Sequence, residues 1–282
     1  MTLHALLCGS RRSKVVGMQR NRIPKFRSQA FLSGLLVCAA AHAAEPSPSA
    51  VATFNAYAEA VEVRLARQHR SASGFLASAA YDPANEARLR RGDLIVEQLT
   101  PPSGAALPGA LLHDWRGRAF APGATPSDFV RLMRGIDAWP QVYAPQVLRA
   151  AVLAQDGDHL QAAMRVRQRH VITVTMDSTY DITFGRLDAQ RGFSLSRSTR
   201  IVEVDASGHA LPASQEHGFL WRLNTYWSYE ERDGGLYLQV ESISLSRSIP
   251  TGLAWAVAPF IESVPRDSLE FTLRATCNAL RK

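Results

Sequence analysis

The side chains best suited to binding a ligand in this sequence are large and apolar, and they recur at every second position of two predicted strands. Alternate residues of a strand face the same side of a sheet, so residues of one parity form one wall. Aromatic rings with a polar tip suit the walls of ligand pockets. The residues so placed are Met176, Tyr180 and Phe184 on one strand and Trp221, Trp227 and Tyr229 on the other. Such a wall could belong to a filled core or to a cavity.

Charged residues on the predicted strands are the second group of candidates. Arg200 lies on the strand predicted over 193–204, and Glu241 lies within 236–247, where the apolar residues change parity. Such a change indicates either a bulge or a strand that is covered on both faces. Glu241 could therefore turn inward, pair with an arginine and orient a ligand carbonyl or carboxylate. The alternative for both residues is a solvated outer face of the sheet.

The motifs of common enzyme classes are missing. His113, His159, His170, His209 and His217 show neither H-x-H nor HExxH spacing, so no metal site is expected. The sequence has no GxSxG, P-loop or GxGxxG motif, and no cofactor is expected. No residue is assigned a catalytic role. His170, at the start of a strand, and Glu241 are the candidates for an acid or base.

The elements that position these residues follow a simple order. An amphipathic helix is predicted over 51–69, followed by strands over 93–99 and 110–120. Thr125 and Asp128 resemble a capping box at the start of a helix over 126–136. About six antiparallel strands then precede a long C-terminal helix over 251–281. An antiparallel sheet packed on one long helix is an α+β design.

The beginning of the chain predicts export. Seven of the 32 basic residues and no acidic residue lie before Ala44, which leaves 25 basic and 25 acidic residues in the rest of the chain. A near-neutral chain has no bulk field for binding nucleic acid. The basic segment, the apolar run over 30–41 and Ala41-His42-Ala43 predict a Sec-type signal peptide that is cleaved before Ala44. The mature protein is then expected in the periplasm or outside the cell.

The predicted domains follow from these segments. Residues 1–43 form the signal peptide, although Met18 could be the true start, because 1–17 add no recognisable feature. Residues 44–92 form a linker and a helical N-terminal extension. Residues 93–282 form the main domain.

The chain resembles the START-like superfamily, also called SRPBCC or helix-grip. The resemblance covers about residues 93–281 and is carried by the element order and by two segments, "GFLWRLNTYWSYEERDGGLYLQVESISLSRSIPTGLAW" and "PRDSLEFTLRATCNAL". Among its members, the sequence is most similar to secreted bacterial proteins related to coenzyme-Q-binding and polyketide-cyclase-like domains. The resemblance implies a curved sheet of about six to eight strands around the last helix, with an apolar cavity between them. Trp255 and Phe260 on that helix then join the ligand-binding candidates.

Three functions remain open on these grounds. The first is an exported binding or carrier protein for a hydrophobic small molecule such as a lipid, a quinone or a polyketide. The second is a cyclase- or aromatase-like enzyme that uses the same cavity, and the third is an envelope scaffold with a filled core. The expected partner is a hydrophobic small molecule and not nucleic acid. A transient membrane contact and the oligomeric state are left open.

Overall fold

An antiparallel sheet forms the centre of the fold. The computed structural model describes residues 45–71, 74–77, 80–100, 105–169, 173–248 and 254–281, with the backbone alone described at 105–106 and 254–262. Within these ranges the strands are β1 (Ile95–Gln98), β2 (Ala105–Leu107), β3 (Ala110–Pro122), β4 (Val147–Asp156), β5 (His159–Arg169), β6 (Thr173–Arg186), β7 (Arg191–Val204), β8 (Arg222–Arg232) and β9 (Gly235–Arg247). They lie in the order β1-β3-β9-β8-β7-β6-β5-β4, and β2 pairs with β3 as the ninth strand. The predicted α+β class is confirmed.

Strand β6 shows how the sequence pattern produces the sheet. Its even positions from Val174 to Phe184 are buried, whereas its odd positions carry Thr and Asp and are half-buried or exposed. The residues Asp233-Gly234-Gly235 also predict a tight hairpin turn, and the structure has one between β8 and β9. Asp233 and Gly234 both have positive φ angles, of 57° and 73°, which suit a two-residue hairpin turn.

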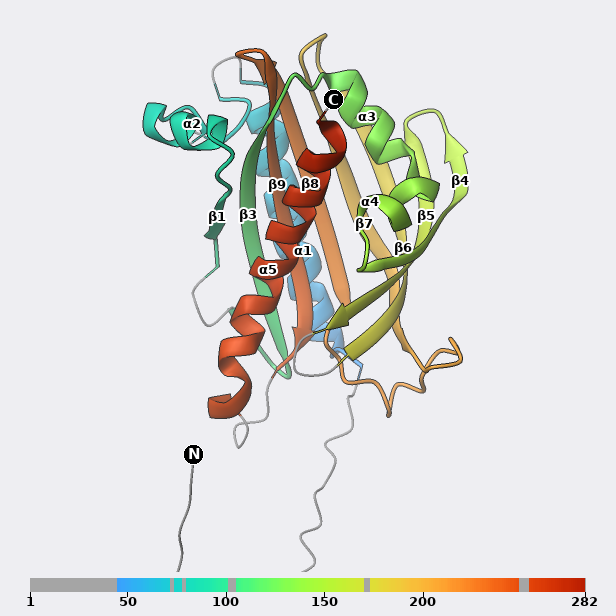
Figure 1. Ribbon diagram of the computed structural model, residues 1–282. Helices are drawn as coiled ribbons and strands as arrows, with labels where there is room; N and C mark the ends of the chain where they lie inside the picture. The colour runs from blue at the N-terminus through green and yellow to red at the C-terminus, as the bar shows by residue number, and fades with distance from the viewer. Residues whose placement is uncertain are drawn as a thin grey trace, which may run out of the picture. The chain divides into compact units, whose positions relative to one another are not determined.

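Two helices cover opposite faces of the sheet, α5 in front and α1 behind in the view of Figure 1. Helix α5 (Ala254–Leu280) packs Leu269 and Leu273 against β3. At Gly117 of β3, a Cβ atom would overlap with the Leu273 side chain, so glycine allows the helix to approach closely. The long C-terminal helix and its packing on the sheet therefore match the helix-grip arrangement.

Helix α1 (Pro48–His69) packs on the other face of the same strands. Phe54, Val61 and Leu65 from α1 contact a cluster that includes Ile243 and Leu245 of β9. Leu236, Leu238 and Val240 of β9 belong instead to the cluster under α5. Strand β9 pairs with β3 and β8 without a register shift, so its parity change reflects cover on both faces and not a bulge.

The remaining helices are short. They are α2 (Pro83–Arg90), α3 (Pro126–Arg134), η2 (Ile136–Ala138) and α4 (Trp139–Val142). The predicted capping box of α3 is present: Asp128 N donates to Thr125 Oγ1 at 3.3 Å, and Thr125 N donates to Asp128 Oδ2 at 3.1 Å. Within the described part of the chain, no helix is both long and apolar enough to cross a membrane.

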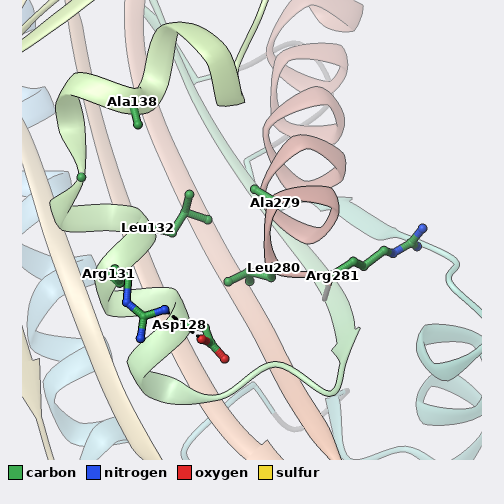
Figure 2. A pocket seen from close by; sticks show the side chains of 8 residues that line it. Asp128, Arg131, Leu132, Ala138, Ala279, Leu280 and Arg281 are labelled. Carbon is green, nitrogen blue, oxygen red and sulfur yellow. Dashed lines mark hydrogen bonds and ion pairs between the residues drawn. The ribbon is translucent and has the colours of Figure 1, made fainter.

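The apolar stripe of α3 is buried unevenly. Phe129 and Met133 pack in the core under α5, whereas Leu132 is half-buried. Leu132 borders a hollow of about 290 Å³ between α3 and the last turn of α5. Figure 2 shows this hollow, with Leu132 on one side and Leu280 on the other.

Candidate ligand cavity

A larger cavity, of about 520 Å³, lies between the sheet and the part of α5 around residues 264–272. Strands β5 to β9 form its floor, α3 and α4 contribute one wall, and the segment 217–220 before β8 contributes another. Pockets for small organic ligands typically have volumes of roughly 300–1,000 Å³. The cavity can therefore enclose a molecule of that class.

One region of the cavity wall is aromatic. Trp139, Tyr180, Phe184 and Trp227 line it, and Trp227 in turn packs against Phe129 with ring centroids 5.5 Å apart. Burial raises the pKa of the Tyr180 hydroxyl, so this group stays protonated and can donate a hydrogen bond. This region offers flat apolar surfaces and a neutral polar tip.

A second region of the wall carries hydroxyl groups on neighbouring strands. Ser196 of β7 lies opposite Thr225 of β8, and Thr225 lies opposite Ser242 of β9. One row further along, Ser244 of β9 lies opposite His113 of β3. All five side chains line the cavity. We call these five residues the hydroxyl band. Four of them carry hydroxyl groups, and the fifth, His113, carries an imidazole.

Apart from His113 and His217, few acidic or basic side chains line the described cavity wall. Among the described residues that line it, there is no Asp, Glu or Lys, and Arg247 is the single arginine. A charged ligand group placed in such a cavity away from Arg247 would lose its hydration without gaining an opposite charge. The wall therefore favours an uncharged ligand.

At one end of the cavity, His217 is held by a buried carboxylate. Glu203, near the end of β7, is 2 % exposed, and its Oε2 lies 2.7 Å from Nδ1 of His217. Glu203 also accepts hydrogen bonds from the backbone N of His217 at 3.0 Å and of Gly218 at 2.9 Å. A carboxylate at Nδ1 favours the tautomer with the proton on Nδ1, which leaves Nε2 as an acceptor. His217 lines the cavity and is half-exposed.

Three of the aromatic residues expected to bind a ligand line this cavity, namely Tyr180, Phe184 and Trp227. Met176 and Tyr229 are buried elsewhere on the same face. Met176 packs in a small cluster with Val174 and Ile201, and the Tyr229 ring lies 4.9 Å from that of Phe129. These two residues do not line the cavity.

Two other candidates lie away from the cavity, which corrects the expectation for them. Trp221 packs in the cluster beneath α1, because it occupies a bend before β8, and the alternation of the strand does not extend to it. Arg200 is exposed on β7. A register shift between Thr179 and Tyr180 separates the outer part of β7 from the regular pairing over 191–198.

Glu241 also differs from its expected place. It is fully buried and does pair with arginines, as anticipated, but it faces α1 instead of the cavity. Arg64 of α1 donates to its Oε1, and Nη2 of Arg116 donates to its Oε2 at 2.9 Å. Because Val240 and Ser242 line the cavity, their neighbour Glu241 must point to the opposite face.

A second carboxylate, Asp114, lies in the same layer under α1. Tyr57 of α1 donates a hydrogen bond to its Oδ2 at 2.9 Å. Burial, together with the negative charge of Glu241, raises the pKa of Asp114 to about 7. This layer fixes α1 to the sheet and has no access to the cavity floor.

The remaining candidates cannot be placed by their side chains. His170 lies outside the described residues. Trp255 and Phe260 belong to α5, but only the backbone is described there. Within the ranges given above, no cluster of three or more His, Cys, Asp or Glu residues could hold a metal ion.

Sequence reasoning missed His217, Glu203 and the hydroxyl band. His217 and Glu203 are fourteen positions apart and meet only because the loop between β7 and β8 folds back, which no periodic pattern reveals. The hydroxyl band had a visible signal. Ser242, Ser244 and Ser246 recur at every second position of a strand otherwise rich in apolar residues.

Comparisons with known proteins give structural neighbours and no sequence relative. No family model matches the chain, and no curated protein matches it. Among solved structures, a STAR-related lipid transfer protein from Xanthomonas axonopodis is 16% identical with a TM-score of 0.42, over 66% of this chain and 99% of that one. Human STARD10 is 9% identical with a TM-score of 0.42, over 69% of this chain and 79% of that one.

A third neighbour is the Zhui aromatase/cyclase from a Streptomyces species, which is 13% identical with a TM-score of 0.41, over 59% of this chain and 92% of that one. TM-scores of this size add no weight to a functional assignment. The chain is similar to START-type proteins, and its own strand order, with α5 packed on the sheet, is that of a helix-grip α+β fold.

Proposed function

We propose that this chain is a binding or carrier protein for a hydrophobic small molecule, held in the cavity between the sheet and α5. The observation that carries the proposal is a cavity of about 520 Å³ lined largely by aromatic, aliphatic and hydroxyl side chains. Transfer of apolar surface from water into such a space is favourable, by about 25 cal/mol for each Å² buried. A few polar groups on the wall then orient the ligand.

A scaffold protein with a filled core, the third function considered above, is not supported by this arrangement. Well-packed interiors leave few voids larger than a water molecule. The cavity is far larger than such a void, and it is lined by small residues such as Ser194, Ser196 and Ser244 where a filled core would have larger ones.

An enzyme of the cyclase type is the second candidate, and the pair of His217 and Glu203 favours it. A histidine oriented by a buried carboxylate at the edge of an apolar cavity is a suitable general base or acid. Glu241 faces α1 and does not provide this arrangement. His170 lies outside the described residues. Conversion of a bound compound by the wild type, and its mere binding by His217→Gln, would identify an enzyme.

The experiment that tests binding combines native mass spectrometry with a cavity-filling variant. Protein purified from its own host under gentle conditions should carry an apolar compound, and an environment-sensitive apolar dye should compete for its place. Ser244→Phe should abolish dye binding without lowering the melting temperature, because the ring fills existing space. Thr179→Phe, at a half-buried position on the other face of β6, is the matched control. Wild-type affinity of Ser244→Phe for the dye would overturn the proposal.

We further propose that the carrier acts outside the cytoplasm. The basic leader, the apolar run over 30–41 and the small residues Ala41 and Ala43 support this proposal. N-terminal sequencing of the protein made in its host should begin near Ala44. An intact leader on protein from the cytoplasmic fraction would contradict export and leave the binding proposal unaffected.

A further inference from the structure

The hydroxyl band is arranged as a polar strip across four adjacent strands, β7, β8, β9 and β3. Ser196, Thr225 and Ser242 are directly opposite one another in the register of β7, β8 and β9. Neighbouring strands are about 4.8 Å apart, so these three groups form a row with that spacing. Ser244 and His113 form a second row beside it on β9 and β3.

Large apolar side chains flank this strip on β8, although Ser194 of β7 lies opposite one of them, Trp227, and also lines the cavity. On the next row of the same strands, Trp227 lies opposite Val240, and both line the cavity. Leu223 lies opposite Ser244 and also lines the cavity. Valine or alanine at the positions of Thr225 and Ser242 would continue the apolar surface without a change of shape. The hydroxyl groups therefore add hydrogen-bonding capacity where the fold does not require it.

An all-hydrocarbon ligand does not match this strip. A hydroxyl group that is covered by hydrocarbon loses its hydrogen bonds to water and costs about 1–3 kcal/mol. A ligand with its own hydroxyl or carbonyl oxygens at this point would replace those lost bonds. The described wall has no Asp, Glu or Lys, and its single arginine, Arg247, lies at the end of β9, five positions from Ser242. The ligand groups that match the strip are therefore uncharged.

The aromatic region beside the strip suggests the shape of the rest of the ligand. Trp139, Tyr180, Phe184 and Trp227 provide ring faces and edges, which pack best on a flat molecule. A flat body in this region would lie with one edge along Thr225 and Ser242, because Trp227 and Thr225 are two positions apart on the same face of β8.

We propose that the cavity binds an uncharged, ring-containing molecule that carries hydroxyl or carbonyl oxygens along one edge, and that the hydroxyl band recognises that edge. This inference rests on the proposed binding function and narrows its ligand class. It disfavours an unbranched hydrocarbon chain as the cargo. Thr225 and Ser242 are then residues that determine specificity.

The test compares two probes that share one ring skeleton, phenanthrene and phenanthrol, where phenanthrol has one added hydroxyl group. Affinities are measured for the protein that begins at Ala44, from the fluorescence of the probe and from its quenching of tryptophan fluorescence. The wild type should bind phenanthrol more tightly than phenanthrene. The double variant Thr225→Val/Ser242→Ala should lose this preference, with phenanthrol weakened roughly fivefold for each hydrogen bond lost.

Two controls make the result specific. Thr179→Val removes a hydroxyl group from the exposed part of β6, where it bonds to Thr199, and should leave both affinities unchanged. Binding of phenanthrene to the double variant should stay equal or increase. If both probes bind the wild type equally, or if both weaken equally in the double variant, recognition by the hydroxyl band is wrong and the carrier function stands. If neither probe nor the apolar dye binds the wild type, the carrier function itself is wrong.

Discussion

Glu203 binds His217 through both the backbone and the ring: its carboxylate accepts the backbone N–H of His217 at 3.0 Å and lies 2.7 Å from Nδ1. Glu203→Ala should leave these donors and the N–H of the buried Gly218 without their acceptor, which costs about 1–3 kcal/mol for each donor that water does not reach. We expect a lower melting temperature and faster hydrogen exchange at His217 and Gly218. Asp267→Ala, at an exposed position on α5, is the control. Unchanged exchange would show that the loop is held by other contacts.

A change at Glu241 should affect stability and leave ligand binding intact. Glu241→Gln removes the charge that pairs with Arg64 and Arg116, and breaking a buried ion pair typically costs about 3–5 kcal/mol. Because Glu241 faces α1, the dissociation constant for an apolar dye should remain that of the wild type, measured well below the melting temperature. A dye affinity that changes without loss of stability would place Glu241 at the cavity after all.

Asp114 should make the protein less stable as the pH rises towards neutrality. Burial and Glu241 raise its pKa to about 7 from 3.8, so the folded state holds this proton more firmly than the unfolded state between these two values. The stability that this group contributes is therefore lost as the pH rises from about 4 to about 7. Asp114→Asn should be more stable than the wild type at pH ~8, with the advantage shrinking towards pH ~4. Urea denaturation at several pH values measures the difference, and a constant difference would contradict this assignment.

His69 should have the opposite effect on acidification. Its ring is stacked between Phe75 and Phe193, with centroids 4.9 and 4.7 Å away, and its Nε2 lies 2.8 Å from Ser228 Oγ. Burial lowers the pKa of His69 to about 4 from 6.5, so the unfolded state takes up this proton first. Stability should fall as the pH drops from 6.5 to 4. In His69→Phe this part of the pH dependence should disappear in the same denaturation series, and its persistence would assign it to other groups.

Much of the fold could be predicted because its elements have regular local patterns. The alternation of β6, the capping box of Thr125 and Asp128, and the Asp233-Gly234 turn all appear as expected. What could not be predicted is which helix covers which face. The parity change in β9 was compatible with a bulge, and only the packing of α1 on Ile243 and Leu245 distinguishes the alternatives.

The site was predicted in part for the same reason. Trp227 lies inside a regular strand and has the expected face, whereas Trp221 precedes that strand and faces α1. Glu241 is buried as expected, but both faces of the sheet are covered, and sequence parity does not tell which face a buried residue points to. His217 and Glu203 come together through loop closure, which depends on tertiary structure alone.

The position of α1 has a consequence for how the molecule comes apart. Without this helix, the strands behind it would expose Tyr226, Ile243 and Leu245 to water, and Glu241 would lose Arg64 as a partner. The described part of the segment before residue 93 is thus bound into the cooperative folding of the sheet, although none of its residues lines the cavity. If a protease cut between α1 and β1 and α1 dissociated, the remaining fragment would expose the apolar face of the sheet that α1 covers. The fragment would then lose its ligand through aggregation, although its cavity residues were intact.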